Sequence, residues 1–155
     1  SGRADPQIDR MLSTVRVRQF DHDIAQLEAQ GDAAGAEARR QAKDVFLLED
    51  ATDRVRRYPN DLQFRYELGV LLYERNQLNE AIQEFQLASR NPQRRIRSLY
   101  YLGLCFKQKS QLDLALEQLE KAASEVMDAG FLTADLGGTT TTTAFTEQVK
   151  AILEK

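Results

Sequence analysis

The side chains best suited to catalysis or metal binding lie far apart in this 155-residue sequence. The single histidine, His22, lies between Asp21 and Asp23, but a zinc site would need further ligands at suitable spacing, and no nearby residue supplies them. The single cysteine, Cys105, excludes an internal disulfide, and its apolar neighbours indicate core packing rather than a reactive thiol. We therefore expect no metal ion, and we interpret His22 as part of a solvated helix face.

Motifs of enzyme active sites are also missing from the sequence. It has no histidine beside a serine or cysteine nucleophile, no HExxH motif and no glycine loop that leads into a helix to hold phosphate. The acidic residues are instead spread along expected helix surfaces, often near bases, which is typical of solvated faces. We therefore expect that the protein is not an enzyme and uses no cofactor.

A run of basic residues gives the strongest local charge. The segment between Phe85 and Leu112 has no acid and six bases, which are Arg90, Arg94, Arg95, Arg97, Lys107 and Lys109. Such a run can attract an acidic partner or phosphate, and the alternative is a solvated turn and helix face. The net charge of the chain is −3, and nucleic-acid binding would need more basic surface with aromatic platforms beside it, so we do not expect it.

The helices that would carry these side chains are predicted from a residue pattern that occurs twice in the sequence. Arg65-x-x-Leu68-Gly69-x-x-Leu72 recurs as Leu99-x-x-Leu102-Gly103-x-x-Phe106, and Ala81-x-x-x-Phe85-x-x-Ala88 recurs as Ala115-x-x-x-Leu119-x-x-Ala122. Equivalent positions lie 34 residues apart, as Gly69 and Gly103 do. A period of this size indicates stacked units of two helices joined by a turn, with small residues where helices approach closely.

Over residues 62–122 the chain resembles the tetratricopeptide repeat family in its period and in the order Leu-Gly, Ala, an aromatic residue or Leu, then Ala. It departs from the family where the opening Trp is replaced by Arg65 and Leu99, and where the Tyr after Leu-Gly is replaced by Leu72 and Phe106. The resemblance implies an all-α fold, a short α-solenoid of the tetratricopeptide type. The alternative is an unrelated pair of helical hairpins.

A helical hairpin is predicted ahead of the repeats. Asp5-Pro6 is typical of a helix start, apolar residues then recur every three to five positions as far as Leu27, and Gly31-Asp32 breaks the helix. A second helix is expected over about residues 36–58, stopped by Pro59. This hairpin lacks the Leu-Gly signature, so we interpret it as a cap. The predicted organisation is a cap over residues 1–59, repeats over 60–92 and 93–127, and a Thr-rich loop with a short helix over 128–155.

The C-terminal segment carries a second resemblance. Leu132-Thr133-x-Asp135-Leu136-Gly137-Gly138, a Thr-rich stretch and Phe145-Thr146-Glu147 are similar to the carboxyl-terminal end of isocitrate and isopropylmalate dehydrogenases. The segment has none of that family's metal-binding aspartates or substrate-binding arginines, so the resemblance implies no activity. A third repeat is the alternative interpretation, but Gly-Gly and a Thr run are poor helix formers.

A second apolar stripe on the first helix of each repeat indicates a surface that binds a partner. The positions expected to form the repeat core are Leu68, Leu71 and Leu72, and in the second copy Leu99, Leu102 and Phe106. In the tetratricopeptide family the remaining face lines the concave groove that holds a partner peptide. Tyrosines suit such a surface. The predicted groove residues are Gln63, Tyr66, Val70, Tyr73, Arg97, Tyr100, Leu104 and Lys107. The alternative is that the stripe packs against the hairpin or the C-terminal tail.

The leading hypothesis is a non-catalytic protein-interaction module that binds a protein or peptide partner, including an acidic one. A homo-oligomer is left open. The rival hypothesis is an accessory or truncated piece of a dehydrogenase-related enzyme without activity of its own. No apolar run approaches the roughly 18 residues of a membrane span, and no signal peptide is present, so we expect a soluble, cytoplasmic protein.

Overall fold

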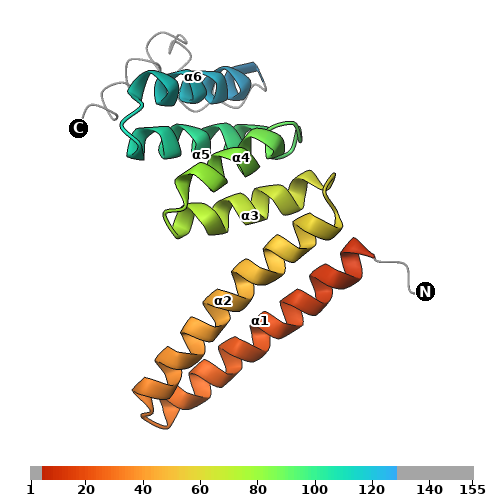
Figure 1. Ribbon diagram of the computed structural model, residues 1–155, viewed down its shortest axis with the longest axis vertical. Coiled ribbons are helices and arrows are strands. Elements are labelled where there is room, and N and C mark those ends of the chain that lie inside the picture. Colours follow the sequence, from red (N-terminus) through yellow and green to blue (C-terminus); the bar gives the residue numbers. More distant parts are fainter. Residues whose placement is uncertain (1–4, 129–155) are drawn as a thin grey trace. The chain divides into compact units, whose positions relative to one another are not determined.

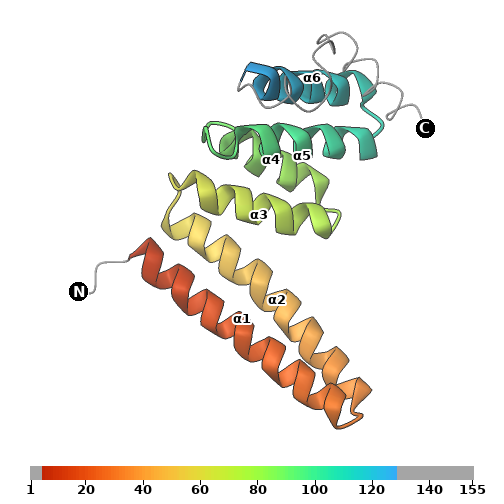
Figure 2. The ribbon, with the colours of Figure 1, turned by 180° about the vertical axis from the view of Figure 1, so that it is seen from behind.

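The computed structural model describes residues 5–128 of the chain, and within them it contains helices and no strand (Figures 1 and 2). This confirms the all-α prediction. The helices are α1 (Pro6–Ala29), α2 (Ala33–Arg57), α3 (Leu62–Glu74), α4 (Leu78–Ala88), α5 (Arg95–Gln108) and α6 (Leu112–Asp128). None of these helices is long and apolar enough to cross a bilayer. The loop and short helix predicted beyond Asp128 lie outside the described residues.

The chain divides into two compact units at Phe64 and Arg65. We call the described residues 5–64 the hairpin unit and residues 65–128 the repeat unit, and each is considered by itself.

The hairpin unit begins and turns where the sequence predicts. The Asp5 carboxylate accepts a hydrogen bond from the Gln7 amide at 2.8 Å, and Pro6 starts α1. Gly31 has a φ of 75°, a left-handed conformation that suits glycine just after a helix. Asp32 then accepts a hydrogen bond from the Gly35 amide at 2.8 Å. Because Asp32 caps α2 in this way, the helix begins earlier than predicted and includes Gly35 in its first turn.

Charged side chains dominate the seam between α1 and α2, which lie side by side (Figures 1 and 2). Phe20 is the buried aromatic residue of α1, and its ring lies 5.6 Å from that of Phe46 and 4.2 Å from the Arg39 guanidinium. Interhelical ion pairs join Arg39 to Asp23, Lys43 to Asp21, Arg40 to Glu28 and Arg57 to Asp9. The apolar residues that are more than half exposed on α1 are Ile8, Met11, Leu12 and Val15. The apolar stripe at the start of α1 therefore does not face α2.

The backbone of the repeat unit repeats with the period of the sequence. Asn76 lies in the turn between α3 and α4 and has a φ of 59°. Ser110, 34 positions later, lies in the turn between α5 and α6 and has a φ of 58°. The Gln77 amide donates to the Leu72 carbonyl at 2.9 Å, and the equivalent bond from Gln111 to Phe106 is 2.8 Å. The two copies therefore turn between their helices by the same hydrogen bonds.

The two repeat glycines lie where helices approach closely, as the sequence predicts. A Cβ atom added at Gly69 would lie 2.9 Å from Cε1 of Phe85 on α4. A Cβ atom at Gly103 would lie 2.6 Å from Cγ of Leu119 on α6. Both distances are too short for real contacts, so a side chain at either position would displace its neighbour.

An aromatic cluster fills the core of the repeat unit. Phe85 and Tyr101 stack with their ring centroids 4.8 Å apart, and Tyr66 and Tyr73 meet Tyr101 edge-on at 6.2 and 5.3 Å. The buried aliphatic residues around the cluster include Leu68, Leu72, Leu99 and Leu102, as expected, whereas Leu71 and Phe106 are half-buried.

Arg65 joins the two helices of the first copy. Its guanidinium forms an ion pair with Glu84 on α4 at 3.0 Å. The equivalent residues of the second copy are Leu99 and Gln118, which cannot form this pair.

Candidate functional site

Tyr66, the first tyrosine of the predicted groove, belongs to the core of the repeat unit. Only 9% of its surface is exposed. Its ring meets Phe85 edge-on at 6.0 Å, and the Arg94 guanidinium lies 5.2 Å from its centroid. Tyr66 therefore packs against residues of the repeat unit itself, whereas the alternative interpretation names the hairpin or the C-terminal tail, and it offers little surface to a partner.

Tyr101 is the residue that sequence comparison of the two copies missed. It contacts Tyr66, Tyr73 and Phe85, and so covers the face of α3 that was expected to be open. Its equivalent in the first copy is Glu67, a polar residue, so the repeat pattern did not mark the position as part of the core. Desolvation by burial raises the pKa of Tyr101 above its ordinary value.

The open part of the predicted groove lies on α5. Tyr100 is 51% exposed and Arg97 is exposed, while Leu104 and Lys107 on the same side of the helix are half-buried. The Tyr100 ring also meets the Tyr101 ring edge-on at 6.0 Å. Part of the Tyr100 ring therefore packs on Tyr101, and the rest is exposed to solvent. This face presents one aromatic ring with cations near it.

Of the remaining predicted groove residues, Tyr73 and Gln63 form hydrogen bonds of their own. The Tyr73 hydroxyl accepts a hydrogen bond from Nε2 of the Gln108 side chain at 3.0 Å, and burial raises the pKa of Tyr73. Val70 is half-buried on α3. Gln63 belongs to the hairpin unit, where its backbone amide donates to the Asp61 carboxylate at 2.9 Å.

The basic run divides into structural and exposed cations. Nε of Arg95 pairs with Glu125 on α6 at 2.6 Å, and Nζ of Lys109 donates to the Asn79 side chain at 2.5 Å. Arg94 covers Tyr66, as described above. Arg90 and Arg97 are exposed. The alternative of a solvated turn therefore describes part of the run, and Arg97 remains as the exposed cation beside Tyr100 on α5.

Cys105 is fully buried on α5, which confirms its interpretation as a core residue. Desolvation raises the pKa of its thiol from 9.0 to about 11, although Lys109 acts in the opposite direction. The thiolate is the reactive form of cysteine, so this environment disfavours nucleophilic chemistry. Among the residues that the structure describes, no group of three or more His, Cys, Asp or Glu side chains could hold a metal ion.

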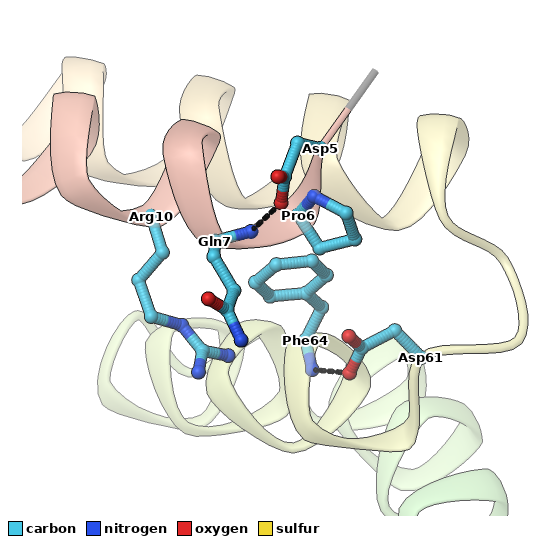
Figure 3. Close-up of a pocket in the computed structure, with 6 residues that line it drawn as sticks. All are labelled: Asp5, Pro6, Gln7, Arg10, Asp61 and Phe64. Carbon is cyan, nitrogen blue, oxygen red and sulfur yellow. Dashed lines mark hydrogen bonds between the residues drawn. The ribbon is translucent and has the colours of Figure 1, made fainter. Parts of the chain in front are cut away.

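A pocket of about 540 Å³ lies in the hairpin unit, where the first turn of α1 meets the start of α3 (Figure 3). The Arg10 guanidinium lies 4.8 Å from the centroid of the Phe64 ring at this pocket. Its two carboxylates are already used as helix caps, since Asp5 accepts from the Gln7 amide and Asp61 accepts from the Phe64 amide at 3.1 Å. The pocket therefore resembles a junction between helix ends rather than a reactive site.

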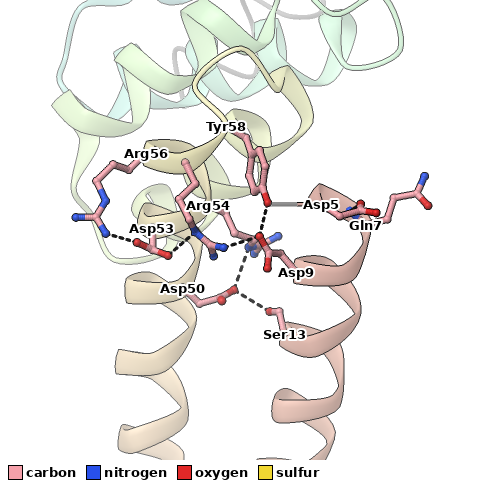
Figure 4. A network of polar contacts seen from close by, with 10 residues as sticks. Asp5, Gln7, Asp9, Ser13, Asp50, Asp53, Arg54, Arg56 and Tyr58 are labelled. Atoms are coloured by element: carbon pink, nitrogen blue, oxygen red, sulfur yellow. Dashed lines mark hydrogen bonds and ion pairs between the residues drawn. The ribbon is translucent and has the colours of Figure 1, made fainter. Parts of the chain in front are cut away.

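A buried arginine organises the polar network of the hairpin unit (Figure 4). Arg54 is 8% exposed, its Nε donates to Asp50 at 3.0 Å, and its guanidinium lies 4.9 Å from the Phe64 centroid. Asp50 also accepts from the Ser13 hydroxyl at 2.8 Å, which links α2 to α1.

Asp9 forms the second centre of this network. It accepts hydrogen bonds from the Tyr58 hydroxyl at 2.5 Å and from the Arg57 guanidinium (Figure 4). The bond to Asp9 raises the pKa of the Tyr58 hydroxyl, since it favours the protonated form. Both carboxylates, Asp9 and Asp50, are paired with arginine, so the network joins α1 to α2.

A second hollow, of about 700 Å³, lies between α4 and α6 over α5 in the repeat unit. Its apolar residues are Ile82, Leu102, Phe106 and Leu114, and its polar residues are Asn79, Gln83, Gln86, Lys109, Gln111 and Gln118. Sequence reasoning missed it because Leu102 and Phe106 were assigned to the core.

Comparisons with known proteins identify similarity for one part of the chain. No family model matches it, and no solved structure matches it. A curated protein, the 3-isopropylmalate dehydrogenase of Listeria monocytogenes serovar 1/2a (strain ATCC BAA-679 / EGD-e), is 42% identical over 64 residues, which are 41% of this chain. The match spans 17% of the length of that dehydrogenase. This supports a dehydrogenase-like segment within the chain.

Proposed function

We propose that the protein is a non-catalytic interaction module of the tetratricopeptide type, which binds a segment of a protein partner on the face of α5 around Tyr100. The observation that carries the proposal is the exposure of Tyr100, at 51%, beside a core in which Tyr66 and Tyr101 are packed. A tyrosine presents a large contact area at low entropic cost, and such rings often dominate the binding free energy of an interface.

Charge on α5 favours an acidic partner. The helix contains no Asp or Glu between Arg95 and Gln108, and Arg97 and Lys107 lie on the same side as Tyr100. Cations at the edge of an interface mainly raise the association rate and make it sensitive to salt. A partner segment with an apolar or aromatic anchor and nearby carboxylates would suit this face.

The test compares two exposed side chains of the repeat unit. Peptides selected from a displayed library on the full chain are titrated against the wild type, Tyr100→Ala and Leu112→Ala. Leu112 is 48% exposed at the start of α6, so its truncation removes a similar apolar surface elsewhere. Tyr100→Ala should weaken binding by about 2 kcal/mol, and Leu112→Ala should change it little.

Circular dichroism and thermal melting must first show that both variants fold like the wild type. If well-folded Tyr100→Ala retains wild-type affinity for every selected peptide, the Tyr100 face is not the binding surface. A loss that is equally large for Leu112→Ala would also contradict the proposal, since it would show a nonspecific apolar effect.

The dehydrogenase match supports a second candidate, in which the chain is an accessory or truncated piece of a dehydrogenase-related enzyme. The full reading frame of the parent gene would distinguish the two. A complete dehydrogenase core encoded in frame would favour the second candidate. In either case we expect the chain alone to show no dehydrogenase turnover.

A further inference from the structure

The geometry points to a second peptide-binding surface on the repeat unit, the hollow between α4, α5 and α6, and we infer that it takes an extended segment of a protein with an apolar anchor next to an acidic residue. This goes beyond the proposed function, because the surface shares no residue with the Tyr100 face.

The two surfaces lie on opposite sides of α5. Leu102 and Phe106 line the hollow, and each follows a residue of the proposed face, Tyr100 or Leu104, by two positions. Two positions on an α-helix correspond to a rotation of about 200°. A peptide on one side of α5 would therefore leave the other side accessible.

The floor of the hollow is apolar and one of its edges is open. Ile82 and Leu102 are buried, Phe106 is half-buried, and Leu114 on α6 is 41% exposed. The hollow has a volume of about 700 Å³, within the range of about 300–1,000 Å³ that is usual for ligand sites. An apolar side chain of a partner would cover Leu114 and contact Phe106.

Most polar side chains at the rim of the hollow are carboxamides, which have the same kinds of hydrogen-bonding groups as a peptide backbone. They are Asn79, Gln83, Gln86, Gln111 and Gln118. Each carboxamide carries both donors and an acceptor, as each backbone amide does. A helical partner has already paired its backbone groups internally, whereas an extended segment has N–H and C=O groups to offer. The rim therefore favours an extended segment over a helix.

Charge selects among extended segments. Lys109 is the charged residue among those that line the hollow, and its amine is held at the rim by the bond to Asn79 at 2.5 Å. An ammonium group has three donor hydrogens, so this bond leaves capacity for a carboxylate. An acidic residue beside the apolar anchor would therefore meet Lys109 without facing a carboxylate of the lining residues.

The test probes an array of immobilised extended peptides with the full chain. Each peptide carries a central Leu or Phe, and its neighbours are Asp, Ser or Lys. We expect the Asp series to bind best and the Lys series to bind least. Gln86→Glu and Gln118→Glu, which add a negative charge at the rim, should each weaken the Asp series about tenfold.

Gln93→Glu is the matched control, because it makes the same change at an exposed position outside the hollow. It should change binding by less than about twofold, and Tyr100→Ala should leave binding of the Asp series intact. Gln86 is exposed, so Gln86→Glu decides the test if Gln118→Glu melts at a lower temperature.

Three results would overturn the inference. These are an array with no preference for acidic neighbours, equal losses for Gln86→Glu and Gln93→Glu, and losses for Tyr100→Ala without losses at the rim. The last result would assign the peptides to the Tyr100 face and would leave the proposed function standing. Conversely, peptides that respond to the rim but not to Tyr100 support this surface independently.

Discussion

The hairpin unit and the repeat unit are stabilised by different interactions. In the hairpin, ion pairs such as Arg39–Asp23 join the helices, and the apolar stripe at the start of α1 is exposed. In the repeat unit, helices are joined by a buried aromatic cluster around Phe85 and by close approaches at Gly69 and Gly103. The hairpin seam thus depends more on partly exposed ion pairs, and the repeat unit depends more on packed rings and close approaches of helices.

This difference predicts which substitutions should lower the free energy of unfolding most. Exposed ion pairs contribute about 0–1 kcal/mol each and are screened by salt, whereas burial of a large apolar side chain contributes about 1.5–3 kcal/mol. We therefore expect substitutions in the repeat core to have larger effects than removal of ion pairs at the hairpin seam. The exception is Arg54, which is as buried as many core residues.

The largest effect is expected from Gly103→Leu in the repeat unit. A Cβ atom would already lie 2.6 Å from Leu119, and the rest of the side chain needs further space, so we expect a loss of about 3 kcal/mol or more in the free energy of unfolding. Chemical denaturation followed by circular dichroism measures it. Gln83→Leu adds a leucine at an exposed position and is the control. An unchanged midpoint for Gly103→Leu would show that the close approach is not real.

Arg54→Ala is expected to have the largest effect in the hairpin unit, about 2 kcal/mol. It leaves Asp50 without its cation, although the Ser13 hydroxyl still donates to that carboxylate. Arg56→Ala is the matched control, since the Arg56 side chain is 80% exposed in its ion pair with Asp53. Equal melting temperatures for the two variants would contradict the distinction between buried and exposed pairs.

Salt should separate the two units. Between about 0.1 and 1 M salt the Debye length falls from about 10 to 3 Å, so the ion pairs of the hairpin seam lose strength. We expect amide hydrogen exchange of α1 and α2 to become faster by a few-fold, while exchange of α5 and α6 changes little. Mass spectrometry of proteolytic fragments resolves the two regions. Equal acceleration in both would show that the seam is not mainly electrostatic.

The smallest effect is expected at the turns of the repeat unit. Ser110 has a φ of 58°, which favours glycine, so Ser110→Gly should raise the free energy of unfolding by about 0.5 kcal/mol. Asn76→Gly, at the equivalent turn, should gain less because asparagine tolerates this conformation better. Thermal melting of both variants measures the difference. A destabilised Ser110→Gly would contradict the strain at this position.

Much of the fold could be predicted because its signals are local. Asp5 and Pro6 mark a helix start through their own backbone chemistry, and Gly69 and Gly103 mark close approaches by their spacing. Which residues of the candidate site are exposed depends on contacts between helices, and these contacts cannot be read directly from the sequence. Tyr101 entered the core beside Tyr66 although its counterpart is Glu67, so comparison of the copies could not reveal it.

The exposed stripe on α1 shows the same limit. Periodicity predicts that a helix has an apolar face, but it does not say whether another element covers that face. Leu102 and Phe106 show the reverse case, because residues assigned to the core also line a hollow once the helices on either side are in place.

The burial of Cys105 makes the opening rate of the repeat unit measurable without an added label. A disulfide reagent reacts with the thiolate form of cysteine. The Cys105 thiol is buried and its pKa is raised, so modification near neutral pH requires that α5 first separates from its neighbours. The sequence has one cysteine, so the entire signal comes from this helix. When reagent is in large excess, modification becomes as fast as the separation itself, and the wild-type chain then reports how often its own core opens.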